Sequence, residues 1–185
     1  MSPGPADLTI RTPRLELVTL TASFVRALTA GDTRGAGDEL GSRVGRWLAG
    51  DPSHVVQLHL AERAAVAAGL AGIGRVIVLR AGSRGGRAIG SIGFSGPPDD
   101  HSRLEVSSRI HPAYRGHGYA AEAMTGLLDW ATARFGITRF LVAVPFGGQP
   151  GELVPVEIAV PGPESRYERI HDLVDLSTID RRQGP

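Results

Sequence analysis

The sequence predicts an α/β domain built on a mixed, mostly antiparallel twisted sheet with helices on both faces. Three observations lead to this prediction. A strand at 14–20 is followed by helical segments before the next strand begins. Short strands then follow one another between residues 76 and 110, which favours an antiparallel meander. Finally, a strand, an amphipathic helix and another strand run in order from 103 to 144, which favours a right-handed crossover between parallel strands.

The bulk composition places the chain among soluble globular proteins. Its 185 residues suffice for one domain, and 42% are hydrophobic while 21% are charged. The 20 basic residues against 19 acidic ones give no overall positive field of the kind that drives binding to nucleic acids or anionic membranes. The sequence contains no cysteine and no apolar run of the roughly 20 residues that span a bilayer. We therefore expect a cytoplasmic protein without disulfides, thiolate metal sites, a membrane anchor or direct contact with nucleic acid.

The N-terminal third combines one strand with helices. Apolar residues alternate with polar ones over 14–20, as in a half-buried strand. Thr21 is a typical N-cap and Gly31 a typical helix stop, so a helix is expected between them. A second short helix is expected over 38–48. An aspartate followed by proline at 51–52 then predicts the start of a longer helix that reaches about residue 68.

The middle of the chain predicts a meander and then a crossover. Residues 76–79 and 88–94 flank a glycine-rich connection, which favours a hairpin. Over 103–110 apolar and polar residues alternate, so this strand should have one buried and one polar face. The apolar spacing over 118–135 predicts an amphipathic helix, and 138–144 predicts the strand that completes the crossover.

Beyond Pro145, prolines and glycines recur too often for a long helix. One apolar run, 153–160, can still pair as a strand, and Pro155 confines it to a sheet edge. We therefore divide the chain into a core over 1–145 and an atypical Pro/Gly-rich segment over 146–185.

A short loop joins the strand at 103–110 to the following helix. The first amides of a helix have no intrahelical partner and lie at the positive end of its dipole, so they can hold a phosphate. Glycines let the backbone approach an anion closely, and Arg115 and His117 add polar groups. The loop is therefore a candidate anion site, consisting of Arg115, Gly116, His117, Gly118, Tyr119 and Ala120.

Two other interpretations of this loop exist. Its glycines can simply make a tight turn between a strand and a helix. Gly116, Gly118 and Ala121 also satisfy the Gly-x-Gly-x-x-Ala pattern of a dinucleotide-binding turn. That pattern expects a buried apolar strand before the first glycine and an acid at the end of the next strand. The preceding strand is half polar and 138–144 contains no acid, which argues against dinucleotide binding.

Residues 104–123 resemble the central motif of the GNAT N-acetyltransferase superfamily. The core signature of that family is Arg or Gln, two residues, Gly, one residue, and Gly or Ala, which Arg115, Gly118 and Ala120 match. The N-terminal segment 10–17 is similar to the first strand of proteins in the branch that includes the ribosomal-protein N-terminal acetyltransferases. The resemblance covers about 10–144 and implies the GNAT fold.

The resemblance also implies a reaction, the direct attack of an amine on acetyl-coenzyme A in a ternary complex. The amides from Arg115 to Ala120 would hold the coenzyme pyrophosphate, and the backbone near Ile110 would run beside the pantetheine arm. The thioester would lie where the strands 103–110 and 138–144 splay apart. The acceptor would be a protein N-terminus or a small-molecule amine, and a homodimer is left open.

Glu105 occupies the position at which many members of this family carry a catalytic or water-linked base. An ammonium must lose a proton before it attacks a thioester, and a carboxylate can take that proton directly or through water. The alternatives are a solvated glutamate or one that only recognises the substrate cation. His111 is expected to have a backbone role at the end of its strand, and Glu122 to be an acid at a helix start. The two histidines at 54 and 59 do not share a helix face, so no metal site is expected.

The chain departs from the family after Pro145. Relatives usually continue with a helix and a closing strand that cover the coenzyme and often supply the general acid. This chain shows neither pattern, so its general acid is unidentified and an impaired enzyme is expected. The alternative is a non-catalytic acyl-coenzyme A binding or interaction protein that lacks a complete acceptor site.

Overall fold

The structure is a computed structural model, and it describes residues 9–80, 86–145 and 153–160. Within these ranges two strands precede a mainly helical part, which is followed by a run of three strands, the crossover through α5 and a last strand. In chain order the elements are β1 (Ile10–Arg11), β2 (Leu15–Thr19), α1 (Ala22–Thr29), α2 (Thr33–Leu40), β3 (Ser42–Arg43), α3 (Arg46–Gly50), α4 (Ser53–Val66), β4 (Gly74–Leu79), β5 (Gly86–Phe94), β6 (Arg103–Ile110), η2 (Pro112–Tyr114), α5 (Tyr119–Phe135), β7 (Arg139–Pro145) and β8 (Leu153–Ala159).

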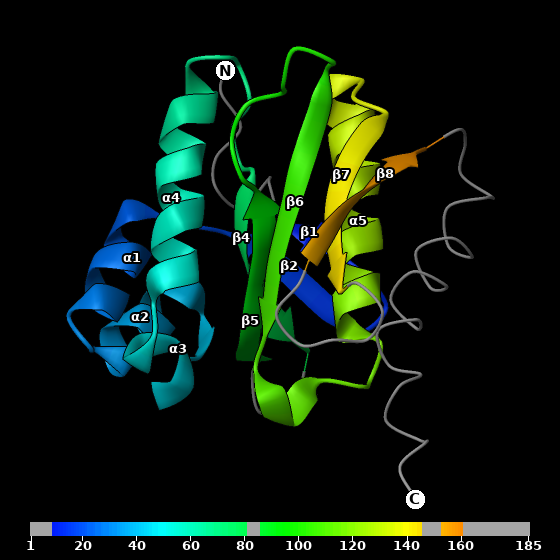
Figure 1. Ribbon diagram of the computed structural model, residues 1–185. Coiled ribbons are helices and arrows are strands. Elements are labelled where there is room, and N and C mark those ends of the chain that lie inside the picture. Colours follow the sequence, from blue (N-terminus) through cyan, green and yellow to red (C-terminus); the bar gives the residue numbers. More distant parts are fainter. Residues whose placement is uncertain (1–8, 81–85, 146–152, 161–185) are drawn as a thin grey trace, which may run out of the picture.

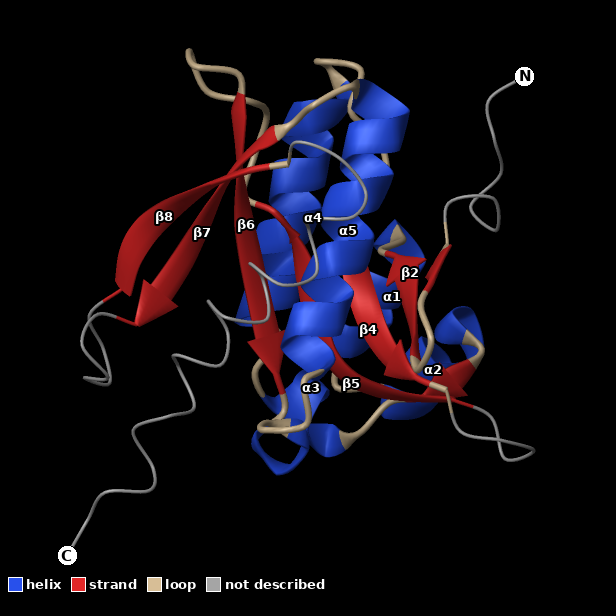
Figure 2. Ribbon diagram, turned by 90° about the vertical axis from the view of Figure 1, so that its right-hand side faces the viewer, coloured by secondary structure: helices blue, strands red, loops and turns tan. Residues whose placement is uncertain are grey.

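The strands form one mixed sheet in the order β1-β2-β4-β5-β6-β7-β8, with β3 added beside β5. Neighbours along this path are antiparallel except β6 and β7, which are parallel. Helix α5 packs on one face against β1, β2, β5 and β6, while α4 packs on the other against β4 and β5 (Figures 1 and 2). The predicted fold class is confirmed.

The core has two parts, one on each face of the sheet. Leu15 and Leu17 are fully buried and belong to the cluster under α5, whereas Leu20 packs with α1 and α4 on the opposite face. Each fully buried leucine of this kind contributes about 2 to 3 kcal/mol to folding. Thr21 caps α1 as expected, because its hydroxyl accepts a hydrogen bond from the amide of Phe24 at 3.1 Å.

The prediction of a helix over 38–48 is wrong. The structure instead has α2, then the two-residue strand β3, then the short helix α3. Helix α2 contains two glycines, which lower its helix propensity. A cap offsets this cost, because the Asp32 carboxylate accepts a hydrogen bond from the amide of Gly35 at 2.8 Å. Gly41 then ends the helix with a positive φ of 65°.

The crossover and the late edge strand are confirmed. Strand β6, helix α5 and strand β7 follow one another, and β6 pairs parallel to β7. Strand β8 pairs antiparallel with β7 along its whole length and is the last strand of the sheet, with Pro155 opposite Ala143. Residues 146–152 and 161–185 lie outside the described residues, so the division at 145 and the lack of a closing helix stay predictions. No helix in the described ranges is long and apolar enough to cross a membrane.

Candidate active site

The sheet opens between β6 and β7. The two strands pair from Arg103 opposite Arg139 to Val106 opposite Val142, and the ladder ends there. Beyond this point β6 continues to Ile110 beside β5, and β7 continues to Pro145 beside β8. Each strand therefore keeps its outer partner while the inner edges separate. The resemblance to the acetyltransferases implied that the two strands splay apart at this position, and the pairing of β6 with β7 does end here.

The loop after β6 leads directly to the first turn of α5. His111 has the expected backbone role, since its Nδ1 accepts a hydrogen bond from the amide of Ala113 at 3.0 Å. Gly116 and Gly118 have φ values of 74° and 75°, a left-handed conformation that favours glycine. Gly118 is the N-cap of α5 and has no side chain to satisfy the first amides of the helix. These amides are therefore without a side-chain cap, which is the arrangement that binds anions at helix N-termini.

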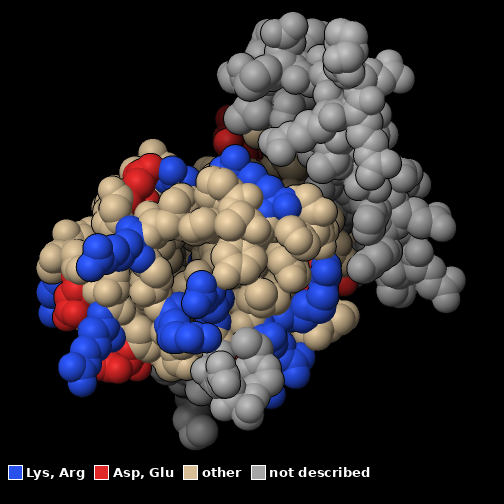
Figure 3. All heavy atoms as spheres, turned by 90° about the horizontal axis from the view of Figure 1, so that it is seen from below, with Lys and Arg blue, Asp and Glu red and all other residues tan. Residues whose placement is uncertain are grey.

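Arginine side chains surround this loop. Arg14 Nη1 donates to the carbonyl oxygen of His117 at 2.9 Å, and Arg115 Nε donates to that of Ile110 at 3.0 Å. Arg87 contacts the loop through the hydroxyl of Tyr114 at 3.4 Å. The sequence contains no lysine, so all 20 basic residues are arginines, and Figure 3 shows several of them on this end of the molecule. The loop is therefore in a positive environment although the net charge of the chain is only +1.

Glu122 connects this loop to the N-terminal strand. Its carboxylate is 5% exposed and accepts hydrogen bonds from Thr12 Oγ1 at 2.6 Å, from the Arg14 amide at 2.7 Å and from Arg14 Nε at 2.6 Å. Burial raises the pKa of Glu122, but the hydrogen bonds and the charge of Arg14 outweigh it and hold that pKa below its usual value. The residue lies in the first turn of α5 as expected, and it also fixes Arg14 against the loop.

Glu105 lies on the polar face of β6, two residues before Ser107. Its side chain is exposed, and the structure gives it no hydrogen bond or ion pair within the described ranges. Neighbouring charges on this face are paired, because Arg103 contacts Asp99 and Glu157, and Arg109 contacts Asp51. Glu105 is thus a free carboxylate near the point where the two strands separate.

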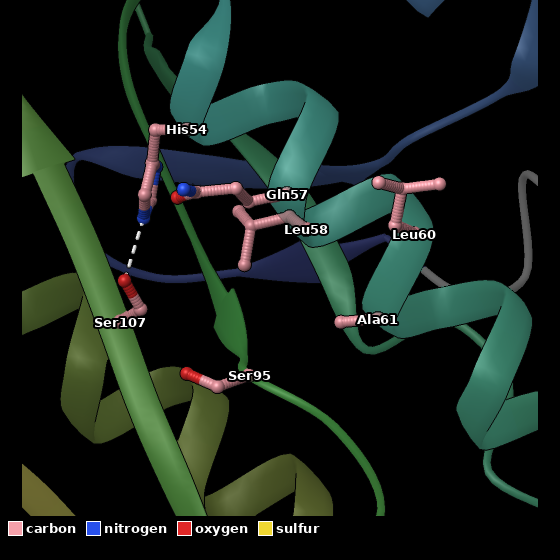
Figure 4. A pocket seen from close by; sticks show the side chains of 7 residues that line it. All are labelled: His54, Gln57, Leu58, Leu60, Ala61, Ser95 and Ser107. Carbon is pink, nitrogen blue, oxygen red and sulfur yellow. Dashed lines mark hydrogen bonds between the residues drawn. The ribbon is translucent and has the colours of Figure 1, made fainter.

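A cavity of about 350 Å³ lies between α4 and the strands β5 and β6 (Figure 4). At its wall, His54 of α4 bridges two serines, with Nδ1 at 2.7 Å from Ser91 Oγ and Nε2 at 2.7 Å from Ser107 Oγ. Burial, followed by the charge of Arg109, lowers the pKa of His54 from 6.5 to about 4. The lining is uncharged and consists of His54, Gln57, Leu58, Leu60, Ala61, Ser95 and Ser107.

Sequence reasoning missed His54 and Arg14 as site residues. His54 was considered only as a metal ligand, and the described residues contain no group of three or more His, Cys, Asp or Glu that could hold a metal ion. Its real neighbours are serines 37 and 53 residues away, on two strands. The spacing of apolar and polar residues along the sequence does not predict such long-range contacts. Arg14 belongs to the matched opening segment, but its contact with the loop spans 103 residues.

Comparison with known proteins identifies the family. The sequence profile of the acetyltransferase (GNAT) domain matches residues 24–145. The chain therefore belongs to the GNAT acetyltransferase family. Membership implies transfer of an acetyl group from acetyl-coenzyme A to an amine, without defining the amine.

Individual relatives are distant. The chain is 33% identical over 51 residues to the uncharacterized N-acetyltransferase YjdG of Bacillus subtilis, covering 28% of this chain and 30% of that protein. Among solved structures it is similar to a putative ribosomal-protein-serine acetyltransferase from Vibrio cholerae, at 19% identity, TM-score 0.48 and 78% of each chain. An acetyltransferase from Agrobacterium tumefaciens has 24% identity and a TM-score of 0.46 over 75% of each chain.

The Glu122 contacts lead to a first prediction. In Glu122→Gln the amide cannot accept all three hydrogen bonds or pair with Arg14, so the unfolding free energy should fall by about 2 kcal/mol. The loop also loses its anchor, and the dissociation constant for coenzyme A should rise about tenfold. Denaturant unfolding and titration calorimetry measure the two effects. Glu16→Gln is the matched control, because the Arg11–Glu16 pair is largely exposed and should contribute below about 1 kcal/mol. Equal effects of the two variants would contradict the anchoring role.

The pKa of His54 leads to a second prediction. An unfolded histidine takes up a proton near pH 6.5, whereas folded His54 does so only near pH 4. Between these values the unfolded state binds more protons, so stability should fall as the pH falls, by up to about 3 kcal/mol. Denaturant unfolding between pH 7 and pH 5 should show this slope in the wild type and lose most of it in His54→Gln. The lowered pKa values of Asp51, Glu122 and Glu157 add a slope of the same sign below about pH 5, where these carboxylates take up protons in the unfolded state. An unchanged slope in the variant would contradict a buried neutral His54.

Proposed function

We propose that this protein is an N-acetyltransferase that binds acetyl-coenzyme A at the Arg115–Ala120 loop and acetylates an amine held on the polar face of β6. The observation that carries the proposal is the separation of β6 and β7 directly beside an uncapped helix N-terminus. A pyrophosphate at the loop and a thioester in the opening are then joined by a pantetheine arm along the end of β6, near Ile110.

The coenzyme side is supported by three features of the loop. The amides of Gly116 to Ala120 precede or begin α5, where the helix dipole favours negative charge. Arg14 and Arg115 are held at the loop by hydrogen bonds to its backbone or to the end of β6. His117 is exposed and its ring stacks on Tyr119 at 5.7 Å between centroids. In this proposal the six residues from Arg115 to Ala120, together with Ile110, form the coenzyme site, which requires no metal.

The acceptor side is the cavity between α4 and β6. It opens on the face that carries Glu105, and its walls are uncharged. We assign to Glu105 the role of base, because its free carboxylate can attract an ammonium and take its proton. The acceptor is a protein N-terminus or a small-molecule amine. An incomplete closing segment after Pro145 would make turnover slow.

One pair of measurements tests this function against non-catalytic binding. Calorimetry with acetyl-coenzyme A reports binding, and release of free thiol reports turnover on peptides with free α-amino groups, a polyamine and an aminoglycoside. Binding together with thiol release that depends on an acceptor is expected. Binding without turnover on any amine would favour an acyl-coenzyme A binding protein, and lack of binding would exclude both.

The loop geometry leads to a third prediction. Gly118→Asp puts a side chain at a positive φ and a negative charge where the pyrophosphate should lie, so coenzyme binding should become undetectable. Gly118→Ala separates strain from charge, since its Cβ would lie 3.4 Å from Arg14 Nη2 without adding a charge. The alanine variant should bind more weakly than wild type but more tightly than the aspartate variant. Wild-type affinity in folded Gly118→Asp would remove the basis of the proposed function.

The assignment of Glu105 leads to a fourth prediction. Glu105→Gln should lower kcat by about 10²-fold and change the shape of the acidic limb of the pH–rate profile, while coenzyme affinity stays within about twofold of wild type. Steady-state kinetics across pH and calorimetry measure these quantities. A profile of unchanged shape with a raised KM for the acceptor would reduce Glu105 to a recognition role.

A further inference from the structure

The bridge formed by His54 fixes the direction of hydrogen bonds at the cavity wall. Ser91 lies on β5 and is fully buried, whereas Ser107 lies on β6 and is half-buried at the cavity. His54 reaches both from α4, which packs against β5, and Figure 4 shows its bond to Ser107. Both ring nitrogens are 2.7 Å from a serine hydroxyl oxygen, so the imidazole has no nitrogen left for a ligand.

The neutral imidazole has one donor and one acceptor nitrogen, so the two serines cannot play the same part. His54 is the hydrogen-bond partner of Ser91 within the described ranges, and the buried Ser91 hydroxyl must donate its proton to avoid a cost of about 1 to 3 kcal/mol. Ser91 therefore donates to Nδ1. The proton of His54 then lies on Nε2, and Nε2 donates to Ser107 Oγ. The hydroxyl proton of Ser107 is consequently directed away from the ring and into the cavity.

The charges around His54 keep this arrangement constant with pH. Arg109 of β6 is the cation that faces the ring, and its own partner is Asp51, which precedes α4. Glu105 lies on the same face of β6, two residues before Ser107, whereas Arg109 lies two residues after it. Burial and Arg109 together hold the pKa of His54 at about 4, so the ring is neutral throughout the pH range in which amines react. Ser107 thus remains a donor toward the cavity.

Ser107 is the first residue of β6 beyond the last pair with β7, at the point where the opening begins. If the thioester lies in this opening, as the proposed function requires, its carbonyl oxygen is close to the hydroxyl of Ser107. We propose that Ser107 is a catalytic residue that donates a hydrogen bond to the oxygen that becomes negative when the amine attacks, and that His54 is the residue that positions it. This inference rests on the proposed function and adds the Ser107 hydroxyl to its site as a hydrogen-bond donor.

The proposal gives Ser107 and Glu105 complementary tasks. Glu105 takes the proton of the attacking nitrogen, and Ser107 stabilises the oxygen without losing its own proton. A donor that is already aligned in a site shielded from water stabilises such an oxygen strongly, and removal of one typically lowers kcat by about 10²- to 10³-fold. The half-buried His54 ring bonds Ser91 and Ser107 together, so the Ser107 hydroxyl is aligned before the reaction and need not reorient during it.

A first experiment tests the hydrogen-bond direction in the intact protein without any substrate. Long-range ¹H–¹⁵N spectra of the histidine side chains, assigned by comparison with His54→Gln, should show His54 protonated on Nε2 and not on Nδ1 at pH 7. This pattern should persist to about pH 5. Protonation on Nδ1, or a charged ring at pH 7, would overturn the proposal whatever the catalytic activity is.

A second experiment tests the catalytic role with acetyl-coenzyme A and the best acceptor of the amine panel. Ser107→Ala should lower kcat about 10²-fold with coenzyme affinity within twofold of wild type. His54→Leu should cause a similar loss, and the double variant should lose little more, because both changes remove the same donor. His54→Gln keeps a donor and should recover part of the rate. Ser23→Ala, in the first turn of α1 where the hydroxyl bonds Glu39, is the matched control outside the proposed site and should stay within about twofold of wild type.

The outcomes separate the two proposals. Fully additive losses in the double variant, or a wild-type kcat in Ser107→Ala, would overturn the role of Ser107 while leaving the proposed function intact. If His54→Leu does not fold, the comparison of Ser107→Ala with His54→Gln and the spectra still decide the matter. Failure of the wild type to bind acetyl-coenzyme A would defeat the proposed function and this inference together.

Discussion

The end of the pairing between β6 and β7 is the constraint on which the candidate site depends. A parallel pair can separate at one end only if each strand is held on its other side, since unpaired backbone groups are costly when buried. Here β5 holds β6 through Ile110, and β8 holds β7 through Pro145. Beyond Val106 and Val142 the inner edges pair with no other strand in the part of the chain that the structure describes, and the proposed function places an extended ligand there. An amide-containing arm, such as pantetheine, suits such an edge because it can pair with backbone groups.

Strand β8 is important for the same reason. It lies after residue 145, where the match to the family profile ends. Without β8, β7 would be an edge strand with nothing to hold it away from β6. Proline at 155 is tolerated there because β8 is itself the edge of the sheet. The residues after 145 thus supply at least strand β8, which pairs with β7 along the side away from β6.

The sequence predicted most elements, and the reasons for its failures are physical. Strands β2, β5 and β6 and helices α1, α4 and α5 follow from apolar periodicity, caps and breakers, which are local signals. The helix predicted over 38–48 was wrong because the Asp32 cap starts α2 earlier and outweighs the low helix propensity of the two glycines in α2. The anion loop could be located because a motif lies within a few residues. His54 could not be assigned its partners, because they come from β5 and β6 and only the folded sheet brings them together.

Two buried polar groups show how such distant contacts act on the site. Glu122 bonds to Arg14, which in turn bonds to the carbonyl of His117, so residues far apart in sequence fix the loop before α5. Ser91 and His54 do the same for Ser107. In both cases a group inside the fold satisfies its own hydrogen bonds and thereby orients a residue of the proposed site. If the proposed function holds, the loop and the hydroxyl are ordered before a ligand binds, so binding need not offset the entropy of ordering them.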